Sequence, residues 1–301
     1  MPRGPFWSDS IYEGGRVKEL FSMTEKTGGH GRAERRRGMG RDFWTALYAL
    51  MERDMAGRVA YRLSFLISGL SALLFFVALF YVAKLVDSKL LNGSDYFTFA
   101  VIGVVVYGTT AGVVYAPRAF LMREFGNGTL EIILSLRISL LTLLNASVVR
   151  EIGQNVFKAV FVLSVLLSLG GHLRLERLAA VIPILLLALP ASLGLGFFQA
   201  GLEMRLRKLG RVATILGGAG AVLTGVYFPV SLLPNFLERF AELLPATHAI
   251  NAARALLAHG RWDTAALTVL GIQSLLYLPV GLFVLESGYR ALLREGTYLT
   301  Y

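Results

Sequence analysis

Six apolar stretches of about 20 residues each restrict this chain to architectures built inside a membrane. A helix rises about 1.5 Å per residue, so about 20 apolar residues are needed to cross a hydrocarbon core of about 30 Å. Charged residues make up only 17% of the chain, whereas soluble domains carry about 25%. We therefore predict an all-α integral membrane protein with six transmembrane helices, at about 59–84, 96–115, 149–169, 178–201, 212–232 and 265–289.

The region before the first span divides into two parts. Residues 1–40 are rich in Gly, Arg and Glu and have little periodic apolar pattern, which is typical of a disordered basic tail. Within 41–58, by contrast, Phe43 and Leu47 recur at helical spacing opposite charged residues. This pattern predicts an amphipathic helix that lies along the membrane interface. The membrane domain is then expected to cover 41–301.

Lys and Arg residues gather in one set of loops, and their distribution predicts the orientation. The tail, 118–137, 205–211 and the segment after the last span carry many more of them than the opposite loops do. Cytoplasmic loops of membrane proteins have this excess of positive charge. We therefore expect a multi-pass protein of the cell membrane (inner or plasma membrane) with both termini in the cytoplasm.

The same distribution accounts for the net charge of +10. The charge lies at the ends of apolar stretches, so nucleic acid is not an expected partner. The chain has no cysteine, which excludes a disulfide framework, a thiolate metal site and a cysteine nucleophile.

The stretch from Gly225 to Leu257 is too polar and too broken by proline to span a bilayer, and too apolar for a soluble loop. Its pattern predicts two short amphipathic helices hinged at Pro234 and Pro245, because proline cannot continue a helical hydrogen-bond ladder. Helices of ten to twelve residues are about 15–18 Å long, too short to cross. We expect 229–262 to form a re-entrant external hairpin that shapes an exit; a helix pair resting on the membrane surface is the alternative.

A Gly-Asn-Gly sequence at 126–128 interrupts the predicted cytoplasmic segment 118–137 and precedes a short helical pattern. Thr129 and Glu131 stand at the start of this pattern, where a hydroxyl cap and a negative charge stabilise a helix. The apolar side chains expected on its cytoplasmic face are Leu130, Ile133 and Leu134. An apolar cytoplasmic face needs a protein partner or the bilayer. Docking into a soluble subunit is favoured, and a helix resting on lipid is the alternative.

Four polar residues at the start of the predicted third span share one helix face: Glu151, Gln154, Asn155 and Lys158. Polar groups inside a membrane normally face the interior of the helix bundle or a water-filled cavity. Two interpretations remain open. This end of the helix protrudes into the cytoplasm, or the four residues line a route through the membrane.

Small residues predict close helix packing on two other spans. Ser192, Gly194 and Gly196 lie on the fourth, and Gly217, Ala221 and Gly225 repeat at every fourth position on the fifth. Close approach of backbones drives helix association in lipid. Packing within one subunit is favoured over a seam between two copies.

Sequence patterns for catalysis are missing. No G-x-x-x-x-G-K-[ST] phosphate loop occurs, and the four histidines do not form H-E-x-x-H. We therefore expect a protein that is not itself an enzyme, with no catalytic residues, no metal and no cofactor of its own.

Two motifs carry a resemblance to a known family. The first is Glu124–Ser139, EFGNGTLEIILSLRIS, which is similar to a Glu-x-Gly-Thr-x-Glu segment that enters an ATPase. The second is Gly225–Pro234, GVYFPVSLLP, followed by Leu243–Arg254, LLPATHAINAAR; it resembles an external signature before the final span. On these motifs the chain resembles the membrane subunit, or permease, of type-2 ABC exporters of the daunorubicin and polysaccharide type. The resemblance covers about 41–290.

The resemblance implies the permease of an ATP-driven transporter that exports an amphipathic, lipid-linked or drug-like substrate. ATP and Mg²⁺ would bind to a separate ABC ATPase subunit present in two copies. A second permease copy, identical or related, would complete a homodimer or heterodimer surrounded by membrane lipid.

The resemblance also implies roles for individual residues. The residues expected to couple the permease to the ATPase are Glu124, Gly126, Gly128, Thr129, Leu130, Glu131, Ile133 and Leu134. The residues expected to form the external gate are Phe228, Pro229, Pro234, Phe236, Phe240, Pro245 and Arg254. Two other functions stay open: a secondary transporter driven by an ion gradient, and a membrane scaffold that recruits a soluble partner.

Overall fold

The structure is a computed structural model, and it describes residues 44–45, 47–48, 62–85, 96–129, 139–168, 177–206 and 219–295. Every regular element in these ranges is helical, which confirms the all-α prediction for this part of the chain. The elements are α3 (Arg62–Ala83), α4 (Tyr96–Gly126), α6 (Leu140–Ser168), α7 (Val181–Leu206), η3 (Val230–Leu232), α9 (Asn235–Glu242), α10 (Pro245–His259) and α11 (Thr264–Glu295). A short helical piece at 219–223 precedes η3.

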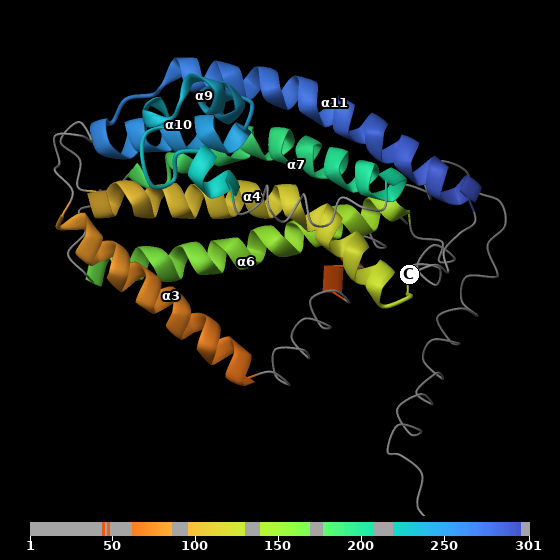
Figure 1. Ribbon diagram of the computed structural model, residues 1–301, viewed down its shortest axis with the longest axis horizontal. Coiled ribbons are helices and arrows are strands. Elements are labelled where there is room, and N and C mark those ends of the chain that lie inside the picture. The colour runs from red at the N-terminus through yellow and green to blue at the C-terminus, as the bar shows by residue number, and fades with distance from the viewer. Residues whose placement is uncertain are drawn as a thin grey trace, which may run out of the picture.

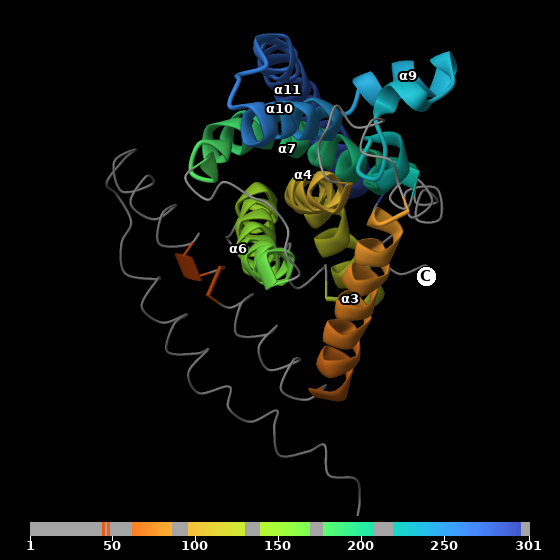
Figure 2. The ribbon, with the colours of Figure 1, turned by 90° about the vertical axis from the view of Figure 1, so that its left-hand side faces the viewer.

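Four long helices run side by side and form the body of the molecule. Figure 1 shows α4, α6, α7 and α11 extending in roughly the same direction, with α10 beside them at one end. Figure 2 shows α3 standing away from this bundle and α9 projecting from its edge. We call the two ends of the bundle the α10 end and the Gly126 end, after the helix at one and the last residue of α4 at the other.

Three of the described helices are long and apolar enough to cross a membrane: Tyr96–Gly126, Val181–Leu206 and Thr264–Arg294. A shorter apolar helical stretch, Leu73–Ala83, lies in α3. Large apolar side chains are exposed along α11, with Leu275 and Phe283 each 76% exposed. Lipid is the natural surrounding for such a surface, and the chain is a multi-pass membrane protein.

Buried apolar side chains form two main clusters, one at each end of the bundle. At the Gly126 end, Leu121 of α4, Leu144 of α6 and Phe197 of α7 belong to the same cluster. At the α10 end, Ile250 of α10 packs in a second cluster with Leu270 of α11. Each cluster draws on α4, α7 and α11, which therefore run parallel to one another.

Glycine pairs bring α7 and α11 into direct backbone contact. A Cβ atom added to Gly281 would meet the carbonyl of Gly194, and one added to Gly288 would meet the carbonyl of Gly201. Both pairs are spaced seven residues apart, which is two helical turns. The sequence analysis predicted that Gly194 lies at a helix contact, and Gly194 lies at the contact between α7 and α11. The two helices therefore pack as one unit with no room for a larger side chain between them.

α7 and α11 end at Leu206 and Glu295, past their predicted ends at residues 201 and 289. α4 and α6 differ most in extent from the sequence prediction. α4 continues beyond the expected end at Tyr115, through Pro117, to Gly126. α6 begins at Leu140 and not near residue 149. Ser139 caps its start, because the Ser139 hydroxyl accepts a hydrogen bond of 3.1 Å from the backbone N–H of Thr142.

The helix at 219–223 also ends before the predicted limit at Leu232. Gly225 has a φ of 77°, a left-handed conformation that terminates the helix and that glycine adopts without strain. Pro229 follows and precedes the single turn of η3. The structure does not describe 207–218, so the start of the predicted fifth span lies outside the described residues.

Several predicted features fall wholly or largely outside the described residues. They are the tail at 1–40 and the coupling residues Leu130, Glu131, Ile133 and Leu134. Of the interface helix predicted at 41–58, only four residues are described. Leu47 is buried in the cluster at the Gly126 end, while Trp44 and Tyr48 are 68% and 70% exposed.

Candidate functional site

The hairpin lies between the helix at 219–223 and α11 in the sequence. Its second helix, α10, is inserted into the bundle. α10 buries nine residues, among them Ala249, Ile250 and Ala253, against α4, α7 and α11. α9 differs, because Ala241 is its one buried residue. Its aromatic side chains Phe236 and Phe240 are 68% and 50% exposed. The hairpin therefore has an anchored helix and an outlying helix.

Prolines mark both helix starts in the hairpin. Pro234 immediately precedes α9, and Pro245 occupies the first position of α10. Proline suits these places because the first turn of a helix leaves its N–H groups without an intrahelical acceptor. Gly260, with a φ of 68°, ends α10, and the guanidinium of Arg177 donates to the Leu257 carbonyl over 3.2 Å.

Side chains of α10 and α11 hold the carbonyl groups at the end of α9. On α10, the Thr247 hydroxyl donates to the Ala241 carbonyl over 2.6 Å, and His248 Nε2 lies 2.8 Å from the Glu242 carbonyl oxygen. On α11, Gln273 donates to the same Glu242 carbonyl over 3.0 Å, and the Tyr277 hydroxyl donates to Leu243 over 2.9 Å. A short helix with an exposed apolar face is thus fixed to two longer ones.

Arg254 joins three separate segments through one guanidinium group. Its Nη1 donates to the Gly225 carbonyl and one Nη2 hydrogen to the Val226 carbonyl, each over 2.8 Å. Its Nε and Nη2 also donate to the Phe99 carbonyl, over 3.2 Å and 3.0 Å. The guanidinium carbon lies 3.4 Å from the centre of the Phe99 ring. α10 is thereby tied to the start of α4 and to the turn before η3.

The surroundings of Arg254 are close-fitting. A Cβ on Gly103 would lie 2.6 Å from both Arg254 Nη2 and the Val226 carbonyl oxygen, so this position of α4 requires glycine. Burial lowers the pKa of Arg254 from its ordinary value to about 9, and the guanidinium therefore stays protonated at neutral pH. Carbonyl dipoles and the aromatic ring stabilise that charge.

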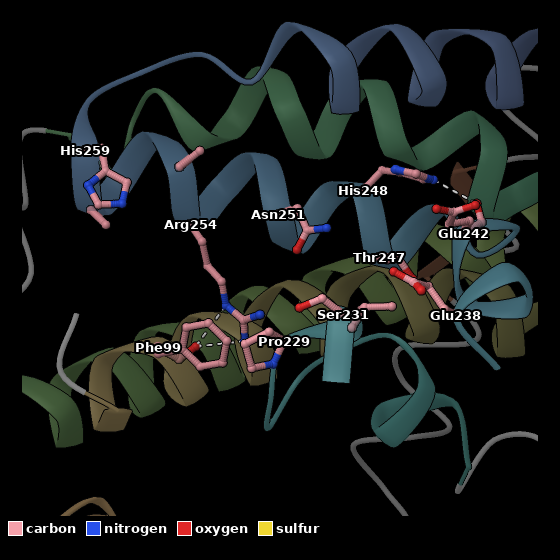
Figure 3. Close-up of a pocket in the computed structure, with 13 residues that line it drawn as sticks. Phe99, Pro229, Ser231, Glu238, Glu242, Thr247, His248, Asn251, Arg254 and His259 are labelled. Carbon is pink, nitrogen blue, oxygen red and sulfur yellow. Dashed lines mark hydrogen bonds between the residues drawn. The ribbon is translucent and has the colours of Figure 1, made fainter. Parts of the chain in front are cut away.

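A cavity of about 450 Å³ lies between the hairpin and α4. Figure 3 shows Arg254 and Asn251 of α10 pointing toward Phe99, Pro229 and Ser231, with Glu238 and Glu242 of α9 at the far side. The lining mixes charged, polar and small apolar side chains: Phe99, Pro229, Val230, Ser231, Glu238, Glu242, Thr247, His248, Asn251, Arg254, Ala255, Ala258 and His259.

The predicted gate residues are distributed around this cavity. Pro229 and Arg254 line it, whereas Phe236 and Phe240 stack edge to face on the exposed side of α9, with centroids 4.8 Å apart. Phe228 lies in the turn before η3. The cavity-lining glutamates, Glu238 and Glu242, were not singled out from the sequence, although their i, i+4 spacing was visible there.

At the Gly126 end, α4 terminates in a turn that binds back to its own last residues. Thr129 donates from its backbone N–H to the Glu124 carbonyl over 3.1 Å and from its hydroxyl to the Glu124 carboxylate over 2.5 Å. Gly128 supports this turn with a φ of 65°. The sequence predicted that Thr129 caps the segment that follows; in the structure its hydroxyl is directed to α4, because the buried carboxylate of Glu124 lies one turn before it.

An ion pair that the sequence analysis missed joins α4 and α7 at the same end. Arg118 Nε lies 2.9 Å from Glu203 Oε2, and the two side chains are 15% and 2% exposed. A carboxylate buried in an apolar helix needs such a partner. The presence of Glu203 near the end of an apolar stretch was a usable signal, but its partner is 85 residues away in the sequence.

The four polar residues predicted on the third span lie in the middle of α6. Asn155 Nδ2 is 3.4 Å from Glu151 Oε1, and Lys158 Nζ is 3.2 Å from Asn155 Oδ1 and 3.7 Å from Glu151 Oε1. They pack on Gly112 of α4, where a Cβ would meet the Asn155 side chain. Gln154 is partly buried beside them.

The early start of α6 changes where this polar set lies along the helix. Glu151 is eleven residues into α6, about 17 Å from Leu140 in a helix about 44 Å long. The sequence had placed this set at the cytoplasmic end of a span. In the structure it lies near the middle of α6, where Asn155 and Glu151 face Gly112 of α4.

No group of three or more His, Asp or Glu side chains within the described residues is arranged to hold a metal ion.

Comparison with known protein families gives a match over most of the chain. A family model described as ABC-2 type transporter matches residues 43–258, more than two thirds of the chain. The matched range includes both the turn at the end of α4 and the whole of α10 except its last residue. No curated protein matches the chain.

Proposed function

Because the chain belongs to the ABC-2 type transporter family and is thus the permease subunit of an ABC transporter, we propose that it exports its substrate with ATP hydrolysed on a separate ABC ATPase subunit. The family match over 43–258 carries this proposal. In the proposed complex two permease copies, identical or related, pair with two ATPase copies, which bind the ATP and Mg²⁺. Each permease has six spans, with both termini in the cytoplasm.

The end of α4 is the proposed input for the ATPase. α4 has 31 residues and is about 46 Å long, longer than a hydrocarbon core of about 30 Å. Its last turns therefore stand beyond the bilayer if its first turn lies near the opposite surface. The turn from Gly126 to Thr129 then presents the segment with Glu131 and Leu134 to a soluble subunit.

The hairpin is the proposed part of the permease that opens and closes the exit. Its helix α10 is anchored by Arg254, while α9 is held through the carbonyl groups at its end and the buried Ala241. The cavity between them is bounded by both helices and by α4. A shift of α9 relative to α10 would change the volume of this cavity and open or close an exit.

The polar face of α6 supports a route through the membrane. Polar contacts join the side chains of Glu151, Asn155 and Lys158, but the side chain of Lys158 is still 62% exposed. An exposed cation at this depth is favourable where a water-filled route or a second subunit faces it. We propose that Gln154 and these three residues face the route formed between two permease copies.

An amphipathic, lipid-linked or drug-like molecule is the proposed substrate. A polar path beside exposed apolar helices suits a molecule with a polar and an apolar part. The stacked Phe236 and Phe240 beside the cavity offer an apolar surface at the same exit.

Purification of the full-length permease from its own cells tests this proposal. We expect a subunit with a phosphate-binding loop to co-purify in equal amount, and we expect the complex to show vanadate-sensitive ATP hydrolysis. Efflux of a fluorescent amphiphile such as daunorubicin from cells should stop when ATP is depleted and continue when the ion gradients are abolished by ionophores.

Two results would reject ATP-driven export. One is a permease that purifies with no ATPase; that result supports the scaffold or the secondary transporter. The other is efflux that survives ATP depletion and collapses with the ionophores, which identifies a transporter driven by an ion gradient.

A further inference from the structure

A continuous series of contacts connects the Gly126 end with the hairpin at the α10 end. It begins at the turn that binds Glu124, crosses from α4 to α7 at the ion pair of Arg118 and Glu203, and passes from α7 to α11 through their glycine pairs. It ends where Gln273 and Tyr277 of α11 hold the carbonyls at the end of α9.

The crossing from α4 to α7 lies just beyond a break in the α4 hydrogen-bond ladder. Pro117 is inside the helix and has no N–H to donate to the carbonyl of Val113. Gly196 of α7 faces this place, since its Cβ would lie 2.8 Å from the Val114 carbonyl oxygen and 3.1 Å from that of Val113. Figure 1 shows that α4 bends along its length. The two halves of α4 can thus change their relative angle here more easily than in an unbroken helix.

The two halves of α4 make different polar contacts, although both pack on α7. The half before Pro117 is bound to α10 through Phe99 and Arg254. The half after it is bound to α7 through Arg118 and packs at Leu121 in the cluster shared with α11. A bend at Pro117 would therefore change the angle at which α7 and α11 lie against α10, which packs on both of them.

An ion pair links α4 and α7 at this crossing. Glu203 lies seven residues after Gly196, so both point from the same face of α7 toward α4. Its carboxylate is almost fully buried, and loss of Arg118 would leave it without the positive charge that it faces.

We propose that Arg118 and Glu203 are positioning residues for energy coupling, which transmit movement of the α4 end to the paired helices α7 and α11 and through them to α9. The proposal rests on the proposed function, since the movement is supplied by an ATPase. α10 remains attached to the first half of α4 during this step. α9 then shifts against α10, and the cavity between them opens.

Distance measurement between spin labels can test this in the assembled complex. The chain has no native cysteine, so labels can be placed without removing any residue of that type. Phe236→Cys on α9 and Ala258→Cys on α10 are both at exposed positions and report on the hairpin. We expect the labelled complex to show a changed distance on trapping with ATP and vanadate.

The ion pair is then altered by charge exchange. Arg118→Glu or Glu203→Arg alone should abolish the ATP-dependent distance change while ATP hydrolysis continues, and the double exchange should restore the change. The matched control is the exposed pair of Arg290 and Glu286 on α11, 2.8 Å apart, where Arg290→Glu should leave the change as in the parent complex. Melting temperatures of all variants separate loss of coupling from loss of folding.

The outcomes distinguish this inference from the function on which it rests. A complex without an ATPase overturns both. An ATPase-bound parent complex whose hairpin distance does not respond to ATP overturns the inference and leaves ATP-driven export standing. The inference alone is also overturned if the folded single variants keep the full distance change. It is overturned as well if the folded double exchange fails to restore that change.

Discussion

Arg254 serves three acceptors with one side chain, and this explains why the hairpin is anchored where it is. Its hydrogen bonds reach carbonyls of Phe99, Gly225 and Val226, which come from two different segments. A planar fork of donors can do this, whereas the single ammonium of lysine cannot reach the same set of acceptors. The charge, the ring of Phe99 and the glycine at 103 form one fitted contact.

We predict that Arg254→Lys lowers the stability of the purified permease. Two or three buried carbonyls would lose their donor, and an unsatisfied buried acceptor costs about 1–3 kcal/mol. The melting temperature should fall, and protease cleavage within the hairpin should become faster. Arg261→Lys is the control, because Arg261 is exposed on the loop after α10. Equal melting temperatures for the two variants would contradict the anchoring role.

The same contact can be disrupted from the side of α4. Gly103→Ala should lower the melting temperature in the same way, because its Cβ would lie 2.6 Å from Arg254 Nη2. Gly108→Ala is a matched control on the same helix, since no atom lies within 4 Å of its added Cβ. If both alanine variants melt at the parent temperature, the fit around Arg254 is looser than described here.

Residue patterns predicted helix breaks well and long-range contacts poorly. Pro234 and Pro245 were visible as helix starts because their effect on the backbone is local. The bond from Arg254 to Phe99 joins residues 155 apart, and no local pattern specifies it. The same holds for Arg118 and Glu203, whose pairing depends on the way α4 packs against α7.

At the scale of elements, α7 and α11 form the most closely packed pair. Their glycines allow carbonyl groups of one helix to lie where side chains of the other would be. Such contact is favourable in lipid, where packing replaces the hydrophobic effect as the force between helices. The sequence indicated Gly194 as a packing position but did not identify α11 as the partner.

We predict that Gly281→Ala separates this pair. The added Cβ would meet the backbone of Gly194, and overpacking of a tight contact costs about 1–3 kcal/mol. Gly271→Ala on the same helix, with no atom within 4 Å of its Cβ, should be neutral or slightly stabilising, since alanine favours helix by about 1 kcal/mol. Thermal unfolding in detergent compares the two. A Gly271 variant that is the less stable of the pair would refute the packing argument.

Helix ends were the least accurate part of the sequence prediction. Apolar runs fix the middle of a membrane helix, whereas caps and interfacial polar residues extend it beyond the apolar run. α6 gains its first turns from the cap at Ser139, and this moved Glu151 from the expected end of the helix toward its middle.

At the scale of the whole molecule, the two ends of the bundle have different characters. The Gly126 end holds buried charges and a tight turn, and the segment proposed to meet an ATPase follows that turn in the sequence. The α10 end holds the inserted hairpin and its cavity. α7 and α11 run between them as a stiff pair, and α4 bends between them. This division suits a protein that receives a movement on one side of a membrane and uses it on the other.

We predict that Leu134→Asp uncouples the complex. A charge placed in an apolar docking surface weakens binding to the ATPase or prevents transmission of its movement, while the spans still insert. Substrate efflux should fall to background, and the amount of permease in the membrane should stay the same. Charge reversal at Glu131 should act in the same direction. Full efflux by both variants would remove the coupling role from this segment.

The most direct test of the central claim is a photo-crosslinking measurement in intact cells. A photoreactive amino acid at Leu134 should form a covalent adduct with an ABC ATPase subunit, and the same amino acid at Phe236 in α9 should form none. Adducts with lipid alone at Leu134, or an ATPase adduct at Phe236, would contradict the account. In either case the ATPase would not contact the permease at the segment that follows α4.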